Sequence, residues 1–62
     1  MNALFLERHV ESLERARAER ASAYRTRARE LRALAEGLAA EHRDVLLATA
    51  EQYEALAARR DA

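Results

Sequence analysis

The chain has 62 residues, no cysteine, and equal numbers of basic and acidic side chains, eleven of each. This length permits one small domain, which buries only about 60% of the surface of its unfolded chain. The lack of cysteine excludes disulfides and cysteine-ligated zinc sites. Half of the residues are apolar, but sixteen are alanine, which adds little burial. Small scaffolds that lack disulfides and metals commonly gain stability by oligomerisation, so we expect a homo-oligomer.

The first expected element is a helix over residues 3–36, because strong helix formers fill this range without glycine or proline. Asn2 is its expected N-cap residue. Leu6, Val10 and Leu13 recur at helical spacing and form an apolar stripe. The opening segment has only a short apolar cluster, so we expect neither a signal peptide nor a membrane span, and a cytoplasmic location.

The apolar stripe is interrupted in the middle of this helix. The next position in phase beyond Leu13 is Arg17, with Arg20 beside it. A charged residue in a helical seam commonly sets register or partner choice, because burying an unpaired charge is costly. We therefore expect the Arg17 guanidinium to be paired, with Glu14 or with a glutamate of a second chain. The stripe resumes at Tyr24, Ala28, Leu31, Ala35 and Leu38.

A turn is expected over residues 37–44, because Gly37, the only glycine, directly follows the periodic run. Glycine at this place commonly adopts the left-handed conformation that ends a helix, with Leu38 as the apolar residue after it. Asp44 is the expected N-cap residue of a second helix over residues 45–60. The alternative is one unbroken helix through Gly37, since glycine costs only about 1 kcal/mol in a helix interior.

Folding the chain at this turn predicts an antiparallel hairpin in which a large side chain meets a small one in each layer. Leu31 faces Ala50, and Ala28 faces Tyr53. Leu47 is expected on the opposite face of the second helix. The remaining predicted layers place Ala35 opposite Leu46, and Tyr24 opposite Leu56 and Ala57.

The second helix is too short to cover the start of the first, so residues 3–17 extend roughly 20 Å beyond the hairpin. A long uncovered apolar stripe on a small protein predicts a partner surface. The predicted fold is therefore all-α: an antiparallel helical hairpin with a long first helix, assembling as a dimeric four-helix arrangement. The alternative is a bend near Ser22 that folds residues 1–20 back as a third helix. The expected dimer or partner interface comprises Leu4, Phe5, Leu6, Val10, Leu13 and Arg17.

Two segments carry a resemblance to a known group of proteins. YRTRARELRALAE at residues 24–36 and LLATAEQYEALA at residues 46–57 resemble the YRxxAxxLRxLAE and LLxxAxxYExLA segments of short uncharacterised bacterial helical-hairpin proteins. The resemblance implies a hairpin over about the last forty residues. It does not indicate any particular biochemical activity. The matching positions are Tyr24, Arg25, Ala28, Leu31, Leu34, Leu46, Leu47, Ala50, Tyr53, Glu54 and Leu56.

The basic side chains are all arginine, and seven of them lie in residues 15–32. Arg25 and Arg29 repel one another at a spacing of four residues, which predicts that at least one contacts an external acid. Arg32 lies four residues before Glu36, a spacing that favours an intrahelical ion pair. We expect Arg15, Arg25, Arg29 and Arg32 to lie opposite the apolar stripe, as possible contacts for an acidic partner.

A basic helix face is also suited to phosphate contacts, so the alternative function is that of a nucleic-acid-associated protein. Zero net charge and the lack of aromatic residues among the arginines argue against it. No catalytic, cofactor-binding or metal-binding motif is present, and His9 and His42 are expected to pack or cap. We predict a non-enzymatic protein–protein interaction module, such as an adaptor, assembly factor or regulator, that needs no cofactor.

Overall fold

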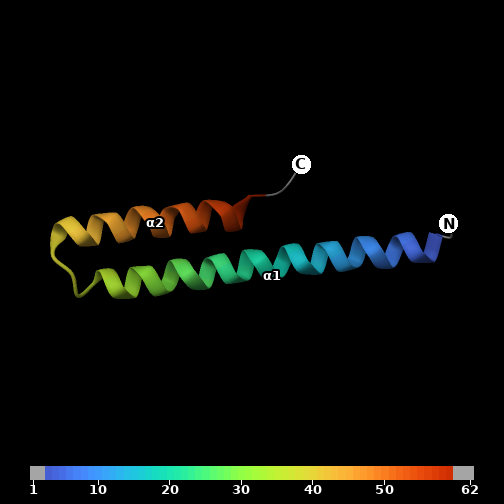
Figure 1. The fold of residues 1–62 in the computed structure, drawn as a ribbon, viewed down its shortest axis with the longest axis horizontal. Coiled ribbons are helices and arrows are strands. Elements are labelled where there is room, and N and C mark those ends of the chain that lie inside the picture. The colour runs from blue at the N-terminus through green and yellow to red at the C-terminus, as the bar shows by residue number, and fades with distance from the viewer. Residues whose placement is uncertain (1–2, 60–62) are drawn as a thin grey trace.

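Two helices, α1 (Ala3–Ala35) and α2 (Ala40–Ala58), make up almost all of the computed structural model, which describes residues 3–59. They lie antiparallel, and α2 runs back along the C-terminal half of α1 (Figure 1). The molecule is a rod, with Cα extents of 58 × 18 × 11 Å. The predicted helical hairpin with a long first helix is confirmed. The alternative of one unbroken helix is wrong, because α1 ends at Ala35 and α2 begins at Ala40. The alternative of a third helix is wrong, because α1 is continuous from Ala3 to Ala35.

α1 continues for 33 residues because its sequence offers no strong helix breaker. Alanine, leucine, arginine and glutamate fill most positions, and these residues lose little conformational freedom in a helix. Ser22, where a bend was considered, lies inside the helix. The expected N-cap residue of α1, Asn2, and the expected last residue of the second helix, Arg60, lie outside the described residues.

The turn is shorter than the sequence predicts, because α2 begins five residues earlier, at Ala40. Asp44 is therefore an interior residue of α2, and its predicted role as N-cap is wrong. Ala39 occupies the N-cap position with an extended backbone (φ −62°, ψ 156°) and makes no side-chain capping hydrogen bond. Its carbonyl accepts the first intrahelical hydrogen bond, from the backbone N–H of Arg43, at 2.9 Å. Glu41 in the first turn interacts favourably with the positive end of the helix dipole.

Gly37 does not adopt the left-handed conformation that the sequence predicts. Instead, α1 ends in two backbone hydrogen bonds, each of which joins residues three apart. The Gly37 N–H donates to the Leu34 carbonyl at 3.3 Å, and the Leu38 N–H donates to the Ala35 carbonyl at 3.1 Å. Such bonds satisfy carbonyls at the end of a helix without a positive φ, so the turn does not require glycine.

The contact between the helices is made mainly by small residues. Ala28, Leu31 and Ala50 form the buried cluster, at 1%, 6% and 0% exposure, and Leu46 and Tyr53 pack against it. Ala35 is also buried. The predicted pairing of Leu31 with Ala50 and of Ala28 with Tyr53 agrees with this cluster, and the Tyr24 and Tyr53 rings lie 6.0 Å apart. Leu47 is half-buried, so its predicted place on the far face of α2 is wrong.

Gly37→Ala should raise the free energy of unfolding by about 0.4–1 kcal/mol, because it restricts the unfolded chain at a position where alanine fits. A Cβ atom built at Gly37 meets nothing within 4 Å. Urea denaturation of the two proteins measures the difference. Ala33→Gly, at an exposed position inside α1, is the control and should lower the same free energy by a similar amount. A loss of stability in Gly37→Ala would show that the turn needs a left-handed residue.

Candidate interaction surface

α2 leaves the N-terminal half of α1 without an intramolecular partner (Figure 1). We call residues 3–20 of α1 the overhang; at 1.5 Å per residue it is about 27 Å long. Leu6, Val10 and Leu13 lie on the overhang with 48%, 50% and 51% of their surface exposed. They repeat at the spacing of one helix face, which continues toward Tyr24 and the buried cluster. The face that binds α2 in one half of α1 is thus open to solvent in the other half.

The other apolar residues of the overhang do not join this stripe. Leu4 is 54% exposed, but residues two apart on a helix do not share a face, so it points away from Leu6. Phe5 is 60% exposed, and its ring stacks on that of His9 with centroids 6.3 Å apart and planes inclined by 3°. The predicted interface therefore divides into a stripe and a separate aromatic pair at its edge.

One edge of the stripe is acidic. Leu6 and Val10, together with Glu7, Glu11 and Glu14, line a shallow hollow of about 360 Å³. Acidic side chains repel anionic lipid headgroups, and they attract an arginine-rich partner. None of the described helices is long and apolar enough to cross a bilayer.

Arginines gather where α2 ends against α1. Arg17, Arg20 and Arg59 line a hollow of about 170 Å³ with Tyr24 and Leu56. The terminal carbonyls of a helix carry partial negative charge, so guanidinium groups are favoured at this place. Arg17 is exposed, because α2 ends at Ala58 without covering it. The interruption of the stripe therefore coincides with the level at which α2 stops.

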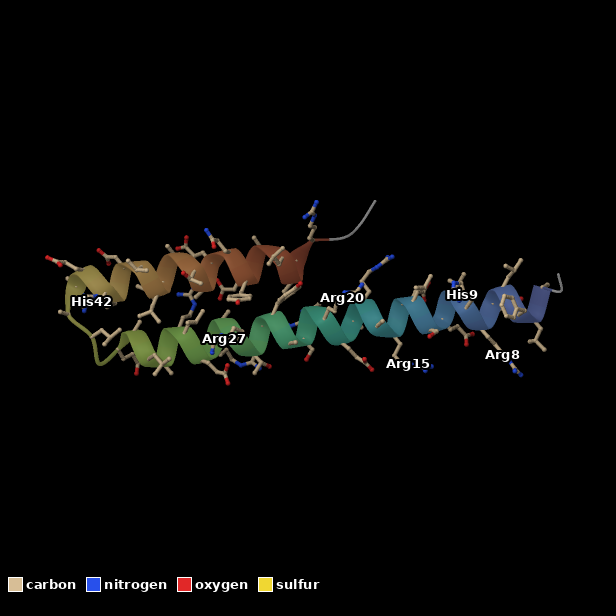
Figure 2. The ribbon with its side chains drawn as sticks, in the orientation of Figure 1. Arg8, His9, Arg15, Arg20, Arg27 and His42 are labelled. Atoms are coloured by element: carbon tan, nitrogen blue, oxygen red, sulfur yellow. The ribbon has the colours of Figure 1, made fainter. Side chains whose placement is uncertain are left out.

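The arginines predicted to form one face are divided between two sides of α1. Arg15 extends from the side opposite the one that α2 covers, as Figure 2 shows. Arg25 and Arg29 instead border a hollow of about 260 Å³ with Glu54 of α2, so they flank the helix pair. The prediction that these arginines all lie opposite the stripe is wrong, because it did not include the position of α2.

Arg32 joins the two helices through an ion pair that the sequence analysis did not identify. Its Nε and Nη2 atoms donate to the two carboxylate oxygens of Glu54 at 3.1 and 2.7 Å. These hydrogen bonds, together with the attraction between the charges, lower the pKa of Glu54 and raise that of Arg32. The acid that Arg32 binds is therefore Glu54 of α2 and not Glu36, which lies just beyond the end of α1. The predicted register, in which Leu31 faces Ala50, places Arg32 opposite residue 49, five residues before Glu54, so it does not indicate this pair.

No cluster of three metal-ligating side chains occurs among residues 3–59. His9 and His42, labelled in Figure 2, lie near opposite ends of the rod. The two histidines therefore do not lie in a common site.

No protein-family model, curated protein or solved structure matches this chain. The resemblance to bacterial helical-hairpin proteins stays a prediction.

Glu54→Gln should lower thermal stability at neutral pH and have little effect in acid. The pKa of Glu54 is lowered on folding, so its ion pair stabilises the fold above the ordinary pKa of 4.5. This contribution is lost as the pH falls through the lower pKa of the folded state. Thermal unfolding at pH 7 and at about pH 3 measures the effect.

Glu51→Gln is the matched control for this variant, since Glu51 is an exposed acid on the same helix that only weakly influences Arg32. An equal loss of stability in both variants, or a loss in Glu54→Gln that does not depend on pH, would contradict a specific role for the Arg32–Glu54 pair.

Proposed function

We propose that this protein is a non-enzymatic interaction module that acts through helical surfaces and functions as a homodimer. The observation that carries the proposal is the half-exposed stripe of Leu6, Val10 and Leu13. Burial of such side chains against another helix is favourable by about 1.5–3 kcal/mol each when it is complete. An adaptor, assembly factor or regulator works by presenting a surface of this kind.

The small core of the hairpin supports the same proposal. Among residues 3–59, the buried residues are three alanines and one large side chain: Ala28, Ala35, Ala50 and Leu31. A 62-residue chain with so little large apolar burial gains from association, as small domains without disulfides or metals commonly do. Self-association would cover the stripe and enlarge the core at the same time.

Replacing Leu6 and Leu13 together with glutamate should abolish self-association. Sedimentation equilibrium at micromolar concentration should give about 14 kDa for the native protein, twice the chain mass of 7.0 kDa, and the chain mass for the variant. The thermal midpoint of the native protein should rise with protein concentration, and that of the variant should not.

The matched control replaces Leu34 and Val45 with glutamate, which changes two residues of 59% and 65% exposure away from the overhang. This control should remain a dimer. A native protein that is monomeric and well folded at these concentrations would overturn the dimer, and loss of association in the control alone would assign the interface to the turn end of the rod.

The nucleic-acid alternative receives less support from the positions of the arginines. Arg32 is engaged by Glu54, and Arg15 lies on a different side of α1 from Arg25 and Arg29. Tight binding of a DNA or RNA duplex that weakens steeply between low and moderate salt would favour this alternative over the proposed module.

A further inference from the structure

One face of α1 has a charge pattern that reverses about its centre. Glutamates occupy its N-terminal half, arginines its C-terminal half, and small residues its middle. Its members are spaced by four, three, four, four, three and four residues, so they lie on one side of the helix. All of them are exposed. We call this the charge-reversed face; it comprises Glu7, Glu11, Glu14, Ala18, Ser22, Arg25 and Arg29.

We propose that two copies of this chain pair through the charge-reversed face, with their α1 helices antiparallel and Ala18 on the twofold axis. The inference rests on the proposed function and specifies the direction and register of the dimer. In this arrangement Glu11, seven residues before Ala18, faces Arg25, seven residues after it, in the second copy. Glu7 faces Arg29 in the same way, and Glu14 faces Ser22.

These charges are available to a partner. No ion pair within residues 3–59 engages Glu7, Glu11 or Arg25, and Arg29 donates to the hydroxyl of Thr26 at 3.1 Å. Arg25 and Arg29 also repel each other on their own helix, so acids from a second copy relieve that repulsion. A parallel dimer in the same register would place glutamate against glutamate and arginine against arginine, which is unfavourable.

The centre of the face is shaped for close approach of another helix. Beside Ala18 lies an open groove of about 780 Å³. Small residues, Ala21 of α1 and Ala57 and Ala58 of α2, line it together with Ala18, and charged residues also line it: Glu14, Arg17, Arg25 and Arg59. Interhelical distance depends on the size of the side chains at the contact, and alanine permits the closest spacing that a side chain with a Cβ allows. Small residues therefore occupy the one part of the face where the two copies of α1 meet on the axis.

The same arrangement brings the apolar stripe to the side of the dimer that carries the partner's α2. Pairing about Ala18 places residues 3–15 of one chain beside residues 21–33 of the other, the segment that carries α2. The stripe and α2 both lie about a quarter turn around α1 from the charge-reversed face. Under twofold symmetry they project to the same side of the paired helices, so α2 of one chain lies diagonally across from the overhang of the other and flanks one edge of the stripe.

Charge reversal tests this pairing. Glu11→Arg and Arg25→Glu should each raise the dissociation constant of the dimer about five- to thirtyfold, because symmetry creates two like-charged contacts in each dimer. The double variant should recover most of the lost affinity, since Glu11→Arg of one copy then faces Arg25→Glu of the other. Arg27→Glu is the control, because Arg27 is exposed, lies off this face and pairs with Glu30 in its own helix; it should leave the dissociation constant nearly unchanged. Additive losses in the double variant would overturn the pairing.

Cysteine cross-linking tests the direction of the helices, and the native chain contains no cysteine. A mixture of Glu14→Cys and Ser22→Cys chains should form a disulfide between the two variants under mild oxidation. Glu14→Cys by itself should not, because its two copies lie about 12 Å apart along the axis, beyond the reach of a disulfide. Cross-linking of Glu14→Cys with itself would show a parallel dimer and overturn the proposal, as would a mixture that fails to cross-link.

The outcomes separate this inference from the proposed function. A dimer that is abolished by glutamate at Leu6 and Leu13 but is insensitive to the charge reversals retains the interaction module and overturns the antiparallel pairing. A native protein that is monomeric at micromolar concentration overturns both.

Discussion

The difference in length between the two helices decides which surfaces of this protein are covered. α1 has 33 residues and α2 has 19, so α2 covers only the C-terminal half of α1 (Figure 1). The two halves of one helix face consequently meet different surroundings. Around Leu31 the face is buried against α2, whereas around Val10 it is half exposed. Arg17 and Arg20 stand at the boundary, where guanidinium groups suit the negative end of α2. The apolar stripe, the arginine cluster and the proposed dimer all follow from this mismatch.

Small residues at the contact have two consequences. Ala28 and Ala50 let the helices approach closely, and they also limit the apolar area that the hairpin buries. The Arg32–Glu54 ion pair adds specificity to the register of the helices, but exposed pairs contribute little to stability. A hairpin built in this way is suited to association, because a second chain would supply the large apolar contacts that its own core lacks. In the proposed antiparallel dimer the partner's α2 flanks one edge of the stripe.

Periodicity predicted the helices and their facing layers, and these long-range features depend on many residues at once. The turn was predicted less well, because it depends on weak local preferences. Asp44 is a better N-cap residue than Ala39 by propensity. However, residues 40–43 are Ala, Glu, His and Arg, which tolerate a helix, and α2 continues through them. Gly37 permits a left-handed conformation without requiring it. The residue pattern of α1 alone does not give the location of α2. Without that location, the sequence could not predict the Arg32–Glu54 pair or the flanking positions of Arg25 and Arg29.

Hydrogen exchange of the α1 backbone amides at two protein concentrations tests most directly whether a second copy of the chain covers the overhang. Helices in proteins are stabilised mainly by packing of an apolar face and less by intrinsic propensity, so the amides of the overhang exchange rapidly unless a partner covers it. We expect protection in residues 7–20 to increase strongly between nanomolar and high micromolar protein. Protection around Leu31 should change less, because α2 already covers it. Protection in the overhang that does not depend on concentration would contradict the claim that a second copy of the chain covers it.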